Sequence, residues 1–174
     1  MVNTVFFDRD GVINEVVLRA GLVSSPRSFD EFRLRHDFVA TFEKIRNRDI
    51  SFFVVSNQPD VSRGLLSPAT LAEMTEALEA RFKFKEIVYC LHDNNDQCLC
   101  RKPKPGMLNY LVEKYRVDCA RAIFIGDSAK DILAGSAAGI STVYLRQKHN
   151  QPAGCQPDFF VDSLAEILPI IDLA

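Results

Sequence analysis

The stretch Thr4-Val5-Phe6-Phe7-Asp8-Arg9-Asp10-Gly11-Val12 joins a short apolar run to two acidic residues. Residues 4–7 have the uninterrupted β-forming character of a strand that is buried on both faces, as in a parallel sheet. Asp8 and Asp10 follow where this strand ends. We therefore expect both carboxylates at the carboxyl end of a central strand.

Similar apolar runs recur along the chain and alternate with segments of helical spacing. One such segment begins at Ser67-Pro68, because Ser can cap a helix and Pro suits its first turn. The β-α-β alternation predicts an α/β protein whose mainly parallel sheet carries helices on both faces. The expected strands are residues 4–7, 51–55, 86–89, 122–125 and 142–145, and helices are expected at 38–45, 67–78, 131–138, from about 105 and from about 164.

Length and composition limit the possible classes of protein. The chain has 174 residues, 47% of them hydrophobic, which suits a single domain over residues 1–174. A formal net charge of -2 without a long Lys/Arg run gives no footprint for nucleic-acid binding. No apolar stretch is long enough for a membrane span, and no signal-peptide pattern precedes the first strand. These features predict a cytoplasmic monomer without nucleic-acid or membrane partners.

Ligands of open α/β sheets bind at the carboxyl ends of the strands, where this pattern puts Asp8, Asp10, Ser56 and Asp127. Carboxylates that converge there would repel one another unless a divalent cation or a nearby Lys compensated their charge. Oxygen ligands favour Mg²⁺ among such cations. The sequence therefore predicts a magnesium site that could also screen an incoming phosphate.

Phosphoryl transfer needs a nucleophile, a proton donor for the leaving oxygen, and donors around the phosphoryl oxygens. Asp8 is the candidate nucleophile and would form an aspartyl-phosphate. Asp10 could protonate the leaving alkoxide and later activate water. Ser56 and Lys102 would hold phosphoryl oxygens. These roles predict a phosphoric monoester hydrolase.

The same residues resemble the motifs of the haloacid dehalogenase (HAD) superfamily. Residues 8–12 resemble its first motif, Ser56 the second, Lys102 the third and residues 126–131 the fourth, in the family's order. The resemblance implies a Rossmann-like HAD fold, with Asp8 and Asp127 binding Mg²⁺ through side chains and Asp10 through its main-chain carbonyl. Asp131 matches a supporting acid, although an acid in a first helical turn can equally be solvated.

A cluster of Cys and His residues lies in the second half of the chain. Cys90 and His92 form one pair and Cys98 and Cys100 another, separated by five residues. This spacing suits one tetrahedral Zn²⁺, and four protein ligands leave no position for water, so the metal would be structural. The alternative is a set of free thiols and a surface His. The zinc loop, residues 90–100, would position the basic residues that follow it.

The chain is also similar, over nearly its whole length, to the capless HAD phosphatases that include heptose 1,7-bisphosphate and histidinol-phosphate phosphatases. No insertion between the motifs is large enough for a large cap domain. The resemblance implies a small phosphosugar substrate, first the C7 phosphate of D-glycero-D-manno-heptose 1,7-bisphosphate in lipopolysaccharide precursor synthesis. Histidinol phosphate comes second and a nucleic-acid 3′-phosphate third.

Three further residues are candidates for substrate binding. Asn57 and Gln58 could read polar groups of the substrate, and the guanidinium of Arg101 could bind a second phosphate or a hydroxyl. The heptose-type signature reads Asn-Gln-Ser-Gly, whereas this chain has Pro59-Asp60 after Asn57-Gln58. The pattern assigns no role to three other arginines, Arg19, Arg27 and Arg63.

Two classes of protein other than an enzyme remain open. A phosphorylation switch of the receiver type is also a small α/β domain that takes phosphate on an Asp with Mg²⁺. Receivers, however, group their acidic pair on a strand before the phosphorylated Asp, whereas the pair here includes the nucleophile. A zinc-stabilised binding protein without activity is the other possibility, which the set of Asp8, Asp10, Ser56, Lys102 and Asp127 disfavours.

Overall fold

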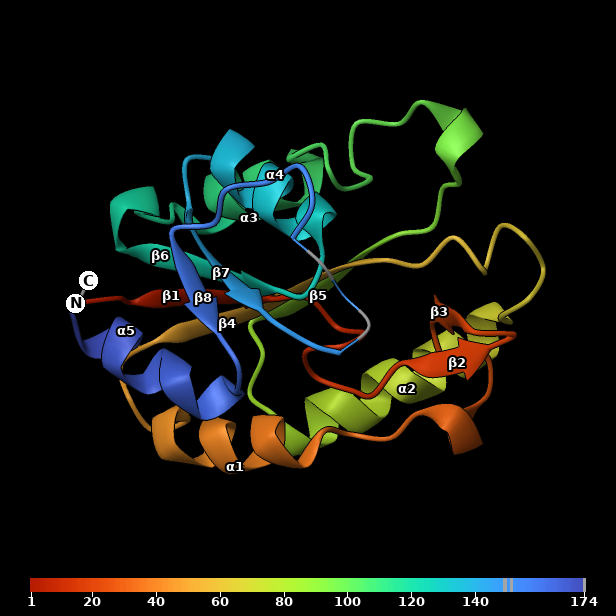
Figure 1. The fold of residues 1–174 in the computed structure, drawn as a ribbon, viewed down its shortest axis with the longest axis horizontal. Helices are drawn as coiled ribbons and strands as arrows, with labels where there is room; N and C mark the ends of the chain where they lie inside the picture. Colours follow the sequence, from red (N-terminus) through yellow and green to blue (C-terminus); the bar gives the residue numbers. More distant parts are fainter. Residues whose placement is uncertain (149, 151, 174) are drawn as a thin grey trace.

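The computed structural model describes residues 1–148, 150 and 152–173. Within these residues, six strands form one parallel sheet in the order β5-β4-β1-β6-β7-β8 (Figure 1). The sheet confirms the predicted fold class. Its strands are β1 (Thr4–Phe7), β4 (Ser51–Asn57), β5 (Glu86–Cys90), β6 (Ala122–Gly126), β7 (Ser141–Leu145) and β8 (Phe159–Val161).

Helices cover both faces of this sheet (Figure 1). Because side chains alternate along a strand, Val5 and Phe7 of β1 point to one face and Phe6 to the other. Val5 and Phe7 share a core with α1 (His36–Ile45), the end of α2 (Pro68–Arg81) and α5 (Ile167–Leu173). Phe6 belongs to a second core with α3 (Gly106–Tyr115) and α4 (Ala129–Ala137).

The helix starts follow from their capping residues. Ser67 accepts a hydrogen bond from the Thr70 amide at 3.0 Å, and Pro68 opens α2 as predicted. Ser128 and Asp131 form a reciprocal capping box at the start of α4. Four short 3₁₀ helices complete the helical elements of the described chain: η1 (Phe29–Glu31), η2 (Asn94–Asp96), η3 (Cys119–Arg121) and η4 (Leu164–Glu166).

A two-stranded antiparallel hairpin, β2 (Val17–Arg19) and β3 (Leu22–Ser24), occupies a segment for which no strand or helix was expected. Its turn has positive φ angles at Ala20 and Gly21. Figure 1 shows the hairpin beyond the carboxyl ends of the sheet strands, on the side away from the N-terminus. The hairpin was not predicted, whereas the lack of a large cap in the described chain agrees with the prediction.

The described helices include none that is long and apolar enough to cross a membrane. The parallel register instead gathers the strand ends that carry the candidate residues. β1 lies between β4 and β6, with Phe7 opposite Val54 and Ile125. The residues that follow these strands, among them Asp8 and Asp127, therefore meet at one edge of the sheet.

Candidate active site

A cavity of about 530 Å³ opens at the carboxyl ends of β1, β4 and β6. Its lining includes Asp8, Asp10, Ser56, Lys102 and Asp127, the residues that the sequence motifs assign to phosphate chemistry. The hairpin, the loop after β4 and the loop after β5 also contribute to its walls. The fold thus brings these candidate residues to one cavity.

Three carboxylates and one ammonium group form the floor. Asp8, Asp127 and Asp131 can each direct one oxygen so that the three atoms lie within 4.8 Å of one another. Lys102 Nζ lies 2.8 Å from Asp8 Oδ1 and 2.6 Å from Asp131 Oδ1, and it donates to the Val55 carbonyl at 2.9 Å. One ammonium group therefore faces three acids, which leaves excess negative charge.

The pKa values of these acids reflect that excess. Burial, followed by the charge of Asp131, raises the pKa of Asp8 to about 7, although Lys102 opposes the shift. Burial and the charge of Asp8 also raise the pKa of Asp127 well above its ordinary value. Burial lowers the pKa of Lys102, but Asp131 and Asp8 outweigh it and raise this pKa. A divalent cation would supply the missing positive charge, so this donor set fits Mg²⁺.

Asp131 is part of this floor rather than a solvated acid. Its residue is 0% exposed, and its Oδ2 accepts hydrogen bonds from Ser128 N at 3.0 Å and from Ser128 Oγ at 2.6 Å. Its other oxygen pairs with Lys102. The solvated interpretation of Asp131 is therefore wrong, and its carboxylate braces both the start of α4 and Lys102.

Asp10 has a different environment from Asp8. The Arg9 guanidinium is 0% exposed, lies between the rings of Phe32 and Tyr89 at 5.6 Å from each centroid, and donates from Nε to Asp10 Oδ1 at 3.0 Å. A buried guanidinium needs such a carboxylate partner, since an unpaired buried charge is costly. Arg9 thus fixes the orientation of the Asp10 side chain at the cavity.

The surroundings of Asp10 also lower its pKa. Burial alone would raise it, but the charge of Arg9 and hydrogen bonds from Asn14 and Gln58 together lower the pKa of Asp10. Asn14 Nδ2 donates to Asp10 Oδ1 at 2.9 Å, and Gln58 Nε2 donates to Asp10 Oδ2 at 2.7 Å. These donors stabilise the ionised form of the Asp10 carboxylate.

Gly11 allows the loop after β1 to approach Asp127. A Cβ atom at this position would lie 2.0 Å from Asp127 Oδ2, and the φ angle of Gly11 is +87°. Both observations favour glycine, because any other residue would clash with Asp127 and strain the backbone. The close approach to Asp127 and the positive φ angle therefore explain why glycine follows Asp10 in the first motif.

Two amides that the sequence analysis did not identify hold Asp127. Gln147 Nε2 donates to Gly11 O at 2.6 Å and to Asp127 Oδ2 at 3.1 Å. Asn150 Nδ2 donates to Asp127 Oδ2 at 2.7 Å. Both residues lie in the loop after β7, where no motif or spacing marked them. Both amides therefore fix the orientation of the Asp127 carboxylate through the same oxygen, Oδ2.

The polar residues at the end of β4 either line the cavity or hold other cavity residues in place. Ser56 and Asn57 line the cavity. The side-chain amide of Asn57, however, is bonded to the main chain of Lys102: its Oδ1 accepts from the Lys102 N–H at 3.1 Å, and its Nδ2 donates to the Lys102 carbonyl at 3.0 Å. Gln58 is 0% exposed, is absent from the residues that line the cavity, and donates to Ser56 Oγ at 3.0 Å. The two predicted substrate-binding amides thus brace Lys102, Ser56 and Asp10.

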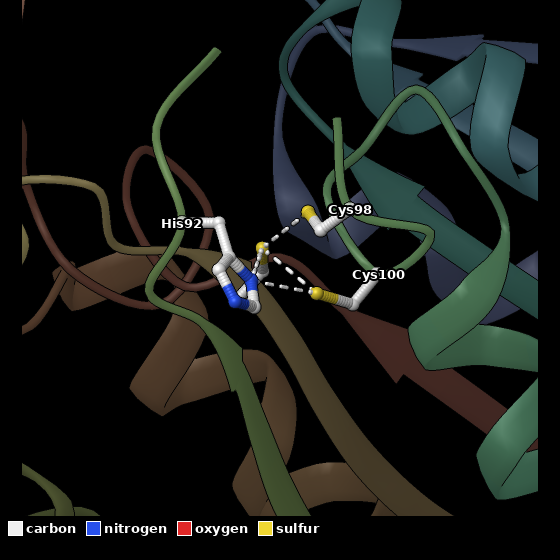
Figure 2. Close-up of side chains that lie close together, drawn as sticks. His92, Cys98 and Cys100 are labelled. Atoms are coloured by element: carbon white, nitrogen blue, oxygen red, sulfur yellow. Dashed lines mark hydrogen bonds between the residues drawn. The ribbon is translucent and has the colours of Figure 1, made fainter. Parts of the chain in front are cut away.

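The predicted zinc ligands converge on one point. Figure 2 shows the side chains of His92, Cys98 and Cys100 directed toward one another. Cys90 Sγ lies 3.6 Å from Cys98 Sγ and 3.1 Å from Cys100 Sγ, and His92 Nδ1 lies 3.2 Å from Cys100 Sγ. The edges of a zinc tetrahedron with bonds of about 2.3 Å to sulfur measure roughly 3.8 Å. The four side chains therefore fit Zn²⁺ after small adjustments.

The pKa values of these thiols are shifted in both directions. Burial raises the pKa of Cys90 to about 12, which disfavours a thiolate there unless a cation is present. Burial also acts to raise the pKa of Cys98, but hydrogen bonds from the Arg101 backbone and the neighbouring thiols lower it to about 7. Thiolates in contact would repel one another, and a bound metal removes that repulsion.

Arginines surround the mouth of the cavity. Arg101 follows the zinc loop and donates to Asn94 Oδ1 at 3.0 Å and to the His92 carbonyl at 3.1 Å. The structure also brings Arg19, Arg27 and Arg63 to the cavity walls, which sequence spacing did not predict. Their convergence depends on the hairpin and on the turn after β4, neither of which has a periodic signal in the sequence.

Comparisons with known proteins agree with this arrangement. A family model described as HAD-hydrolase-like matches residues 99–167. A D-glycero-alpha-D-manno-heptose-1,7-bisphosphate 7-phosphatase of Photorhabdus laumondii is 30% identical over 156 residues, which cover 83% of this chain and 82% of that protein. A D-glycero-beta-D-manno-heptose-1,7-bisphosphate 7-phosphatase of Vibrio cholerae is 31% identical over 153 residues, with 81% and 79% covered.

A solved structure is similar over the entire fold. The crystal structure of D,D-heptose 1,7-bisphosphate phosphatase from B. bronchiseptica, complexed with magnesium and phosphate, superimposes with a TM-score of 0.84. It shares 26% sequence identity with this chain, and the match covers 99% of this chain and all of that one. The similarity includes the strand ends that form the cavity described above.

Proposed function

Because this chain belongs to the HAD phosphatase family that contains the heptose-1,7-bisphosphate 7-phosphatases, we propose that it removes the C7 phosphate from D-glycero-D-manno-heptose 1,7-bisphosphate. The observation that carries this proposal is the floor of the cavity. There a largely buried Asp8 contacts Lys102 within a cluster of three carboxylates. The proposed substrate comes from the names of the relatives, and the proposed reaction is inferred from the residues of the cavity.

Asp8 is the nucleophile in this proposal. Its carboxylate attacks phosphorus, the bond from phosphorus to the C7 oxygen breaks, and an aspartyl-phosphate forms. Asp10 gives the departing oxygen the proton that it took from water in the preceding turnover, while Arg9 and Gln58 hold its carboxyl group at the cavity. Lys102 and Ser56 donate hydrogen bonds to phosphoryl oxygens as negative charge develops on them.

The second half of the reaction regenerates the enzyme. Asp10 takes a proton from a water molecule, which attacks phosphorus and breaks the bond to Asp8. Inorganic phosphate then leaves. The lowered pKa of Asp10 favours the ionised form that this step requires. A group that alternates between acid and base in this way suits turnover better than a stable phosphoprotein switch.

Mg²⁺ is the proposed catalytic cofactor. Asp8 and Asp127 would hold it through their side chains and Asp10 through its main-chain carbonyl, with Asp131 close to the same cluster. When bound, the cation neutralises carboxylate and phosphate charge so that an anionic nucleophile can approach an anionic ester. Gln147 and Asn150 support the site because they fix Asp127.

Zn²⁺ is the proposed structural cofactor of the zinc loop, bound by Cys90, His92, Cys98 and Cys100. The loop leads directly into Arg101 and Lys102, so a fixed loop would hold Lys102 near Asp8. Free thiols that bind metal suit a reducing compartment, which supports the expected cytoplasmic location.

The test is phosphate release with Mg²⁺ across a panel of esters, compared by kcat/KM. The panel contains heptose 1,7-bisphosphate in both anomeric forms, other sugar phosphates, histidinol phosphate and a 3′-phosphorylated oligonucleotide. We expect the heptose bisphosphate to be preferred. A preference for histidinol phosphate would refute the proposed substrate, and no release from any ester would refute the proposed enzyme class.

A further inference from the structure

Two arginines on the cavity wall share one buried acid. Asp60, in the turn after β4, is only 5% exposed. It accepts a hydrogen bond from Arg27 Nε at 2.7 Å and another from Arg63 Nη1 at 3.2 Å. All three residues line the cavity. Asp60 therefore connects the segment after the hairpin to the loop after β4.

The position of Asp60 is unexpected for an anion-binding cavity. A carboxylate in the wall of such a cavity repels a phosphate, and the repulsion grows as the acid is withdrawn from water. Together with Arg27 and Arg63, however, Asp60 forms a trio with one net positive charge. Asp60 can nevertheless increase the affinity for an anion because it fixes the arginines, and an oriented guanidinium loses less conformational freedom when it binds.

The two arginines differ in the donors that they have left. Arg63 directs Nε and Nη2 to Asp93 at 2.7 Å and 2.6 Å and Nη1 to Asp60, so its fork is used within the protein. Arg27 uses Nε for Asp60 and its main-chain N–H for Glu31 Oε2 at 2.8 Å. Neither Nη1 nor Nη2 of Arg27 has a partner among the described residues. Arg27 is thus held at two points with its outer donors available.

We propose that Arg27, oriented by Asp60, is a specificity-determining residue that binds a second phosphate group of the substrate. The proposal rests on the proposed function and deepens it, since the ester cleaved at Asp8 would carry this second phosphate elsewhere on the sugar. The guanidinium presents two parallel donors, which match two oxygens of one phosphate group. Monophosphates of the same sugar lack the group that Arg27 recognises.

A matched pair of substrates tests this role. Heptose 1,7-bisphosphate and heptose 7-phosphate present the same scissile ester, and only the first has a second phosphate. The ratio of their kcat/KM values should fall roughly ten- to a hundred-fold in Arg27→Ala, the range expected for charge-assisted hydrogen bonds. Arg27→Lys should keep part of the ratio because it retains the charge but not the fork. Arg46→Ala removes a surface arginine paired with Glu43 and serves as the control.

A double variant separates direct binding from charge compensation. Arg27→Ala leaves the Asp60 carboxylate in the cavity wall with only Arg63 as partner, so Asp60→Ala in the same chain should recover part of the lost preference. Full recovery to the wild-type ratio would mean that Arg27 only neutralises Asp60, which would overturn the proposal. Thermal unfolding of each variant checks that the fold is retained.

The outcomes also distinguish this inference from the proposed function. If the wild-type protein cleaves both heptose esters and Arg27→Ala lowers both kcat/KM values equally, the inference is overturned while the phosphatase stands. If the wild-type protein cleaves no phosphate ester, the proposed function fails and the inference fails with it. A selective loss for the bisphosphate supports both.

Discussion

Lys102 lies in a direct ion pair with Asp8, with 2.8 Å between Lys102 Nζ and Asp8 Oδ1. The pair joins the loop before α3 to the end of β1, and it opposes the effect of burial on the Asp8 pKa. Lys102 is itself almost completely buried. The ammonium group therefore favours the ionised form of Asp8, which the proposed mechanism requires for attack on phosphorus.

Lys102→Met should lower kcat/KM by about 100-fold or more, because it removes the proposed donor to the developing phosphoryl charge. The variant retains a long side chain but loses the charge and the contacts of the ammonium group with Asp8, Asp131 and the Val55 carbonyl. Steady-state phosphate release measures the loss. Lys114→Met, which removes an exposed ion pair with Glu86, is the matched control and should keep wild-type activity. Equal activity of the two variants would contradict the assignment of Lys102.

Asp8→Asn should abolish turnover with little loss of stability. The substitution removes the proposed nucleophile but also removes a carboxylate whose charge burial disfavours. Activity and the thermal midpoint are measured on the same preparation. Asp49→Asn changes an exposed acid and is the control. Full activity of Asp8→Asn would show that another group attacks phosphorus.

The raised pKa of Asp8 predicts how stability depends on pH without added Mg²⁺. The pKa is about 7 in the folded protein and about 4 in an unfolded chain. Between these values the folded state holds a proton that the unfolded state has released, so this contribution to stability is lost as pH rises from about 4 to 7. Asp127, whose pKa burial also raises, acts in the same direction.

Thermal unfolding between pH 5 and pH 8 tests this prediction. Asp8→Asn should show a smaller decrease in midpoint over that range than the wild-type protein does. Saturating Mg²⁺ should reduce the decrease in the wild-type protein, since the cation replaces the bound protons. The same slope in both proteins without added Mg²⁺ would show that the Asp8 pKa is not raised.

The zinc loop should depend on each of its four ligands. Cys98→Ala opens the site, and a loss of roughly 2 kcal/mol would lower the melting temperature by about 4–8 °C. Elemental analysis should find one zinc per wild-type chain and much less in the variant. Cys119→Ala, outside the loop, should keep its zinc. A wild-type protein that contains no zinc after expression in zinc-replete medium would contradict the assignment.

Gln147 should control the affinity for Mg²⁺ because its amide holds Asp127 Oδ2 and the Gly11 carbonyl. We expect Gln147→Ala to raise the Mg²⁺ concentration at half-maximal activity by about ten-fold, as for other residues that orient metal ligands. Calorimetric titration with Mg²⁺ provides a measurement independent of turnover. Gln156→Ala, at an exposed position in the same loop, is the control.

The centre of the sheet could be predicted from sequence because β1, β4, β6 and β7 are largely buried and are apolar runs. Residues 4–7 and 122–125 have this character, and both correspond to strands of the sheet. The hairpin was missed because β2 and β3 are three residues each, with exposed Leu22 and Val23 instead of an alternating pattern. β8 was missed for the same reason, since it is a short strand at the sheet edge.

The site could be predicted as far as local motifs extend. Asp8, Asp127 and Lys102 belong to motifs, and the structure brings them together. Asp60 and Gln147 act through contacts with residues far away in sequence, so no spacing rule marks them. The side-chain amides of Asn57 and Gln58, at the end of β4, show a second limit of prediction from sequence. Residue type alone cannot tell whether Asn57 or Gln58 faces a ligand or supports a neighbour.

The central claim is that Asp8 carries the phosphoryl group during turnover. Acid quench of the enzyme reacting with heptose 1,7-bisphosphate and Mg²⁺, followed by peptide mass spectrometry, tests it most directly. We predict a transient phosphoryl group on Asp8 that appears only with Mg²⁺ and is absent in Asp8→Asn. A phosphoryl group on another residue, or turnover without any phosphoenzyme at millisecond sampling, would contradict the claim.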